Sequence, residues 1–245
     1  MTLLIKKFNY EEIKKESVNG KRLYACPDGN SVASVTTILD KTKDKTSLIE
    51  WRKRVGETKA NEIATEAASI GTRMHKFLED YVETGNWPSA GSNPYSQQAN
   101  KMATTIKDKA LSKIDEIWGS EVQLYHPKIY AGTTDLVGVF NGAESIMDFK
   151  QTNKPKKEEW VEDYYLQIAA YAMAHDYVHG SKIRQGVIMM CTPDLYYQEF
   201  RITDHELRQY KHKFLKRLDM YHDLIFDEKE QANIQMKEED FKNET

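Results

Sequence analysis

The chain has few cysteines and no long apolar run. Its 245 residues include two cysteines, Cys26 and Cys191, far apart in sequence. Two cysteines cannot supply a four-cysteine zinc or iron–sulfur site within one chain, so we expect unpaired thiols and no iron–sulfur cluster. No apolar run approaches the roughly 18 residues that span a bilayer, and residues 1–10 lack the apolar core of a signal peptide. These absences predict a cytoplasmic protein with no membrane partner.

Excess positive charge is also missing, since the formal net charge is -3. The charge is unevenly distributed: residues 227–245 hold seven acidic residues and three lysines, which leaves residues 1–226 at +1. A protein that acts on nucleic acid needs a local positive groove rather than a basic chain. Composition therefore neither favours nor excludes a nucleic-acid partner.

The apolar pattern predicts a single domain over residues 1–226 and a polar, flexible tail over 227–245. Within residues 3–39, the turn signals Asn19-Gly20 and Asp28-Gly29-Asn30 indicate short strands and hairpins. Helices are expected over 58–84 and 96–118, so that residues 1–118 form N-terminal strands and a helical wall.

Residues 119–226 carry the alternation typical of strands and form the expected core. Strands are predicted over 121–125, 128–140 and 145–150, and Asn141-Gly142 is a strong hairpin turn. A helix over 158–179, strands over 182–191 and 196–202, and a helix over 204–226 follow. The fold class is therefore a mixed α/β (α+β) domain around a central sheet.

Two acidic residues and a lysine meet on the predicted hairpin. Asp148 and Lys150 alternate with Phe149, so they share one face of a strand while Phe149 points into the core. The tight turn can bring Asp135 beside Asp148. Two adjacent carboxylates are stably ionised when a cation lies between them, and Mg²⁺ suits a site with few carboxylates. Lys150 could hold or deprotonate a metal-activated water, or neutralise a scissile phosphate. This set fits phosphodiester hydrolysis.

These residues, with two further elements, resemble a known family. Asp135, Asp148-x-Lys150 and Gln167-x-x-x-Tyr171, preceded by Gly71-x-x-x-His75, are similar to the PD-(D/E)XK nuclease superfamily in its RecB-like branch. Residues 34–39 and 51–56 look closer still to the subgroup of phage-type exonucleases and mitochondrial genome maintenance exonucleases. The resemblance covers about residues 30–225. Asp135 follows Thr134 rather than proline, a departure that is frequent in the RecB-like branch.

The resemblance implies a role for each residue. Asp135 and Asp148, the carbonyl of Phe149, and His75 would bind Mg²⁺ or Mn²⁺, and Lys150 would be the catalytic lysine. Supporting residues would be Gln167, Tyr171 and Glu121, and candidate DNA contacts are Arg52, Arg54, Arg73 and Lys154.

The implied fold is a restriction-endonuclease-like core with an N-terminal helical region. The implied activity is that of a metal-dependent DNA exonuclease that prefers single-stranded DNA with a free end, in a bacterial or phage-infected cell. Two alternatives stay open: an endonuclease of the same superfamily, and a nuclease-fold subunit that binds DNA without cutting it.

Several features also have ordinary structural interpretations. Glu79, one turn after His75, could orient that histidine or be a solvated acid. His175-Asp-Tyr-Val-His179 resembles a zinc signature, but Asp176 replaces the usual glutamate and no third ligand is evident. Trp51, Tyr95 and Trp160 could stack on unpaired bases, although core packing is the default for each. The basic run from Lys211 to Arg217 is expected to be a surface face.

Overall fold

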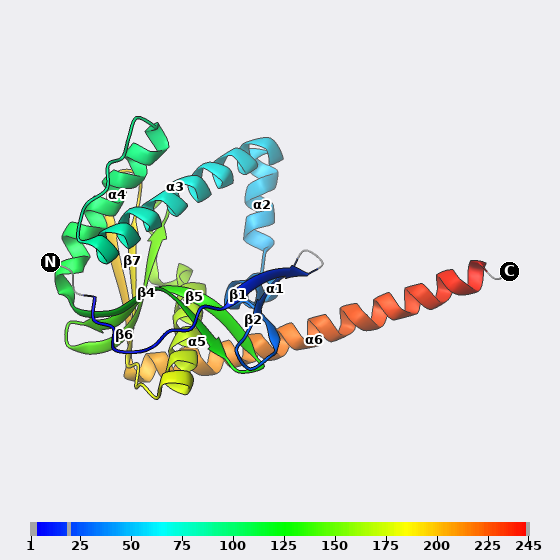
Figure 1. The fold of residues 1–245 in the computed structure, drawn as a ribbon. Coiled ribbons are helices and arrows are strands. Elements are labelled where there is room, and N and C mark those ends of the chain that lie inside the picture. The colour runs from blue at the N-terminus through cyan, green and yellow to red at the C-terminus, as the bar shows by residue number, and fades with distance from the viewer. Residues whose placement is uncertain (1–3, 19–20, 244–245) are drawn as a thin grey trace.

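A five-stranded mixed sheet forms the centre of the protein, as the sequence predicts (Figure 1). This computed structural model describes residues 4–18 and 21–243. Strands follow the order β4-β5-β6-β7-β8, and only β6 and β7 pair in parallel. The strands are β4 (Ile114–His126), β5 (Tyr130–Phe140), β6 (Ala143–Gln151), β7 (Gln185–Cys191) and β8 (Tyr197–Thr203).

The β5–β6 hairpin forms at the predicted turn. Asn141 and Gly142 both adopt positive φ, of 48° and 79°. Two such residues match the right-handed twist of the flanking strands, which explains the preference for Asn-Gly here.

A small antiparallel sheet precedes the main one. It contains β1 (Lys14–Val18), β2 (Lys21–Ala25) and β3 (Ser31–Ala33) in that order. A bridge between Ser34 and Ala131 joins it to β5. Gly29, at φ +81°, turns the chain between β2 and β3 as expected, whereas the Asn19-Gly20 signal lies outside the described residues.

Helix α1 (Val35–Thr42) packs against α6. The two helices that follow it, α2 (Thr46–Val55) and α3 (Glu57–Thr84), form an arch above the sheet (Figure 1). Ser34 caps α1 by accepting a hydrogen bond from the Thr37 N–H, and Gly85, in the left-handed region, ends α3. Figure 1 shows α2 rising from α1 and α3 returning over the sheet toward α4 (Pro94–Ala110).

The predicted helix over 96–118 is wrong at its C-terminal end. The α4 helix stops at Ala110, a 3₁₀ turn covers Leu111–Lys113, and β4 begins at Ile114. Register shifts between Ile114 and Glu116 and between Ile117 and Gly119 interrupt the strand's alternation. These bulges leave Ile114 and Ile117 buried three residues apart, a spacing that resembles a helix.

The C-terminal half ends in two packed helices. A 3₁₀ turn, η2 (Glu158–Trp160), leads into α5 (Glu162–His179), which ends at Gly180 as predicted. The last helix, α6 (Asp204–Asn243), continues well beyond 226, so residues 227–243 are helical and project from the body (Figure 1). No helix within the described ranges has both the length and the apolar character needed to cross a membrane.

The sheet buries a separate apolar core on each face. One core joins the sheet to α1, α5 and α6 and includes Val137, Tyr171 and Phe214. The other joins it to α3 and α4 and includes Met74 and Phe149. The two faces are therefore covered by different helices, and the sheet lies between two helical layers. Cys26 and Cys191 are both buried and unpaired, as expected.

Candidate active site in the fork between two strands

The β5–β6 hairpin opens into a fork at the predicted acidic residues. Backbone pairing of the two strands extends from Phe140 and Ala143 to Leu136 and Met147, and stops there. Beyond this point β5 continues against β4, while β6 continues against β7. Asp135 and Asp148 are the next residues on each side, so the two carboxylates lie where the strands separate.

Asp135 fills the opening of the fork with its side chain. Its Oδ2 accepts a hydrogen bond of 2.6 Å from the backbone N–H of Phe149, and its Oδ1 lies 3.1 Å from Nδ1 of His75. The carboxylate therefore replaces a missing ladder contact and links β6 to α3. Phe149 itself is buried in the core beneath α3 and α4, as predicted.

Asp148 and Lys150 form an ion pair on the face opposite Phe149. Alternation along β6 makes them neighbours, which confirms the predicted geometry of the Asp-x-Lys pair. Both side chains are largely removed from solvent, with 4% and 18% of their surfaces exposed. A buried pair of opposite charges is held because each charge compensates the other's desolvation.

His75 reaches the fork from the long helix α3. Its ring lies edge-on to Phe149, with centroids 6.2 Å apart. One turn earlier, Gly71 faces the end of β6: a Cβ there would lie 3.7 Å from that of Gln151. This close approach of helix and strand brings the imidazole to Asp135. Glu79 pairs instead with Lys76 on the same helix.

Glu121 joins the site from β4, the neighbour of β5 in the sheet. It stands beside Asp135 across the β4–β5 ladder, since Ser120 pairs with Leu136 and Val122 with Thr134. Its φ of +50° lies in the left-handed region, which is uncommon for a non-glycine residue and clusters at functional sites. Ligand atoms of His75, Glu121 and Asp135 all lie within 4.8 Å of one another.

The clustered acids shift each other's pKa values. Burial, followed by repulsion from Asp135, raises the pKa of Glu121 to about 7. Burial also raises the pKa of Asp148 to about 6, against the opposing effect of Lys150. For Asp135, burial is outweighed by His75, Lys150 and the Phe149 N–H, so its pKa is lowered. A cation among these carboxylates would relieve the repulsion.

The donor set fits a divalent metal ion. Ligand atoms of two carboxylates and one imidazole lie within 4.8 Å of one another. Asp148 lies across the fork from Asp135 and is not part of that group. Carboxylates with one imidazole accept Mn²⁺ and Mg²⁺, which differ mainly in their tolerance of nitrogen ligands. The Phe149 carbonyl as a further ligand stays a prediction.

Gln167 and Tyr171 contact each other on α5, and Tyr171 packs against β5. The Gln167 amide donates to the Tyr171 hydroxyl at 3.2 Å, and Tyr171 is buried. The tyrosine ring packs on Gly132 of β5, where a Cβ would lie only 2.6 Å from its Cε1. Glycine at 132 is therefore required for α5 to approach the strand that carries Asp135.

Two residues near the site were not predicted. Lys150 Nζ lies 5.2 Å from the ring centroid of Tyr164, and Lys15 of β1 is close enough to oppose the rise in the pKa of Glu121. Tyr164 lies three residues before Gln167, so helical spacing could have identified it. Lys15 is distant in sequence and carries no such signal.

The four proposed DNA contacts occupy different settings. Arg52 bonds to Glu57 and Asn61 at the corner between α2 and α3, and Arg73 bonds to Ser69 within α3. Arg54 and Lys154 are exposed.

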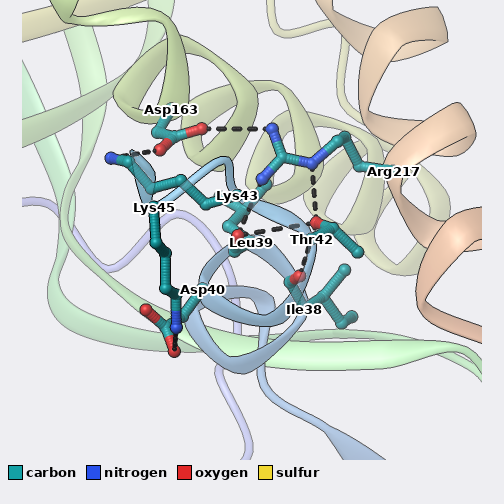
Figure 2. A network of polar contacts seen from close by, with 8 residues as sticks. All are labelled: Ile38, Leu39, Asp40, Thr42, Lys43, Lys45, Asp163 and Arg217. Atoms are coloured by element: carbon teal, nitrogen blue, oxygen red, sulfur yellow. Dashed lines mark hydrogen bonds and ion pairs between the residues drawn. The ribbon is translucent and has the colours of Figure 1, made fainter. Parts of the chain in front are cut away.

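The Lys211–Arg217 run is not simply a surface face: Arg217 inserts between α1 and α5, where it bonds to Leu39, Thr42 and Asp163 (Figure 2).

The zinc-like segment forms a structural histidine instead. His175 is fully buried, and its two ring nitrogens contact the Tyr10 hydroxyl at 3.0 Å and the Ser181 hydroxyl at 2.6 Å. Asp176 accepts hydrogen bonds from Ser181, the Ile183 N–H and Lys211. These contacts engage both ring nitrogens of His175 and the carboxylate of Asp176.

Sequence comparison identifies exonucleases among known proteins. Mitochondrial genome maintenance exonuclease 1 from Homo sapiens is 27% identical over 228 residues, which cover 85% of this chain and 62% of the relative. The Mus musculus protein of the same name is 27% identical over 208 residues, or 78% of this chain and 59% of the relative. The chain thus spans about six tenths of these relatives. No family model matches it.

Solved structures give more distant similarities. A protein from Eubacterium rectale has 16% identity and a TM-score of 0.48 over 66% of each chain. An alkaline exonuclease from Laribacter hongkongensis has 12% identity and a TM-score of 0.35, covering 82% of this chain and 94% of that one. In sequence, the chain resembles exonucleases of the PD-(D/E)XK type.

Proposed function

We propose that this chain is a metal-dependent deoxyribonuclease, specifically an exonuclease that hydrolyses phosphodiester bonds of single-stranded DNA from a free end. The observation that carries the proposal is the fork itself. His75, Glu121 and Asp135 converge within 4.8 Å, and the Asp148–Lys150 ion pair lies on the adjoining strand. The resemblance to proteins named exonucleases supports the same activity.

Mg²⁺ or Mn²⁺ would be held by His75, Glu121 and Asp135, with Asp148 as the next carboxylate. When bound, such an ion supplies Lewis acidity toward water and phosphate oxygens. Asp135 is fixed for this role because the Phe149 N–H and His75 each hold one of its oxygens. Preorganised ligands of this kind need no rearrangement during the reaction.

Lys150 supplies positive charge to the scissile phosphate in this scheme. Although burial alone would lower its pKa, Asp148 and Asp135 outweigh burial and raise the pKa. The ammonium is therefore protonated in the ion pair, which favours phosphate neutralisation over proton abstraction. Removing the Lys150 ammonium would remove its stabilisation of the negative charge that develops on the phosphate in the transition state.

The substrate strand would lie between the arch and the fork. Arg54 on α2 and Lys154 after β6 are exposed cations, and they would contact phosphates. Arg52 and Arg73 would add charge from the arch. Contacts to phosphates position a strand without selecting its sequence, so cleavage would be non-specific.

Digestion of end-labelled DNA tests this function. Wild type and Lys150→Ala would be incubated with linear single-stranded, linear duplex and circular single-stranded DNA, in Mg²⁺, Mn²⁺ or EDTA. We expect wild type with metal to degrade the linear single strand fastest and to leave the circle intact. Lys182→Ala is the matched control, since Lys182 is exposed at the other end of the sheet.

The alternatives predict different products. Cleavage of the circle would identify an endonuclease. A gel shift by both wild type and Lys150→Ala, with every substrate left whole, would identify a DNA-binding subunit that does not cut. Equal digestion by both proteins would show that the fork is not the active site.

A further inference from the structure

A stripe of polar and aromatic side chains leads from the 3₁₀ turn η2 along helix α5 toward the fork. Trp160 ends η2, and Tyr164, Gln167 and Tyr171 follow on α5 at spacings of three and four residues, which place those three on one side of the helix. The stripe ends at Tyr171, buried beside Gly132, and begins at Trp160, which is 57% exposed. One end therefore meets the acidic cluster and the other meets solvent.

Trp160 is not a core residue. Its exposed fraction leaves most of the indole in water, although burial of a tryptophan is strongly favourable. The backbone that carries the ring is anchored, since Val161 beside it is fully buried and the Trp160 backbone N–H bonds to the Lys157 carbonyl at 3.0 Å. A large aromatic surface is thus held in water by a fixed backbone.

One cation lies beside each of the two rings. Lys150 Nζ lies 5.2 Å from the ring centroid of Tyr164, and Lys157 Nζ lies 5.4 Å from that of Trp160. Trp160 ends η2, and Tyr164 lies in the first turn of α5, where its N–H bonds to the Val161 carbonyl at 2.9 Å. The order Lys150, Tyr164, Trp160, Lys157 therefore leads outward from the fork, each ring with a cation beside it.

Three acidic residues next to this stripe pair with cations. Glu159 pairs with Lys157 and Glu162 with Lys213. Asp163 is held by Lys43 at 2.7 Å and by Arg217 at 3.3 Å, as Figure 2 shows. These pairs anchor the first turn of α5 against α1 and α6, and they reduce the repulsion that a passing phosphate would meet.

We propose that Trp160 and Tyr164 form a stacking surface for unpaired bases adjacent to the bond that is cut. Stacking of bases on aromatic rings is tolerant of sequence, and cations beside the rings would contact the intervening phosphates. The surface explains a preference for single strands, because paired bases do not expose their faces. The inference rests on the proposed nuclease function and assigns its substrate-binding contacts.

An abasic scan of the substrate tests the stacking surface. Single-stranded oligonucleotides, each lacking one base at a successive position from the labelled end, would be digested by wild type, Trp160→Ala and Trp160→Phe. In wild type we expect KM to rise when the missing base is the one on the surface. Trp160→Ala should raise KM for intact DNA by about tenfold and lose sensitivity to that position, while kcat changes less. Trp160→Phe should restore most of the wild-type KM and most of the sensitivity to that position.

Tyr177→Ala is the matched control, since Tyr177 is 65% exposed near the C-terminal end of α5, far from Trp160. It should behave as wild type, and all variants should have the wild-type melting temperature. A Trp160→Ala protein with wild-type KM and the wild-type abasic profile would overturn the proposal, and would leave Trp160 as a contact for a protein partner.

Failure of the nuclease function is distinguishable from failure of this inference. If wild type cuts no DNA, the proposed function is wrong, yet binding of the same oligonucleotides in EDTA can be followed by fluorescence anisotropy. The stacking surface predicts a position-dependent loss of affinity in wild type that Trp160→Ala abolishes. Identical anisotropy profiles for the two proteins would reject it.

Discussion

Asp135 Oδ2 accepts a 2.6 Å hydrogen bond from the Phe149 N–H, so a side chain closes the ladder at the point where β5 and β6 separate. The acidic residue thus has a structural role and a proposed metal-binding role. The two roles can be separated, because asparagine retains an acceptor oxygen but loses the negative charge.

Asp135→Asn should keep the fold and abolish activity. Asp135→Ala should also be inactive, and it leaves the buried Phe149 N–H without its acceptor, which costs about 1–3 kcal/mol of unfolding free energy. Urea unfolding of both variants measures the difference. Equal stability of the two would mean that the hydrogen bond contributes nothing.

Glu121→Gln should weaken metal binding, because the Glu121 carboxylate lies in the cluster with His75 and Asp135. Loss of a carboxylate from the cluster should reduce the affinity for Mn²⁺ by about tenfold or more. The readout is the rise in melting temperature with Mn²⁺ concentration, which depends on binding to the folded state. Glu116→Gln, on the same strand, is the control. An unchanged Mn²⁺ dependence would remove Glu121 from the site.

Arg217 should be a strong determinant of stability. Its guanidinium donates to the Leu39 carbonyl at 2.7 Å, to Thr42 Oγ1 at 2.6 Å and to Asp163, which joins three helices (Figure 2). Arg217→Gln should lower the unfolding free energy by about 1–3 kcal/mol. Arg217→Lys should recover only part of the lost unfolding free energy, since an ammonium cannot reproduce the planar guanidinium's set of donors. Arg208→Gln, an exposed position on α6, should be neutral.

Acid should destabilise the protein partly through His175. Burial, followed by the charges of His179 and Lys7, lowers the pKa of His175 to about 3. Above the unfolded pKa of about 6.5 both states hold a neutral ring. As pH falls from there toward 3, only the unfolded state takes up the proton, and stability declines by up to about 1.4 kcal/mol per pH unit.

His175→Gln isolates this effect. The variant should be less stable than wild type at pH 8, because it loses contacts to Tyr10 and Ser181, but its stability should fall less steeply between pH 6 and pH 4. Denaturant unfolding at several pH values gives both slopes. Parallel slopes for the two proteins would contradict a neutral buried His175.

Local sequence signals predicted the centre of the site. The Asn141-Gly142 turn fixed the hairpin, and alternation placed Asp148 and Lys150 on one face with Phe149 in the core. These features depend on neighbouring residues alone. The resemblance then identified His75, which contacts Asp135 from a helix 60 residues away.

Features that depend on tertiary packing were less predictable. Bulges in β4 gave Ile114 and Ile117 a helix-like spacing, so the strand start was missed. Glu121 faces the site through a left-handed backbone, which no sequence period indicates. Arg217 belongs to a charged run that suggested a surface face, and only the packing of α6 on α1 and α5 shows its burial.

The most direct test of the account is the single-turnover rate of single-strand cleavage by wild type, Lys150→Ala and Asp148→Asn at saturating Mn²⁺. The Asp148–Lys150 pair is predicted to stabilise the transition state, so each substitution should reduce the rate by about 10²-fold or more, while Lys182→Ala retains it. DNA binding in EDTA should persist in all four proteins. A Lys150→Ala rate within about threefold of wild type, far less than loss of such an interaction costs, would contradict the account.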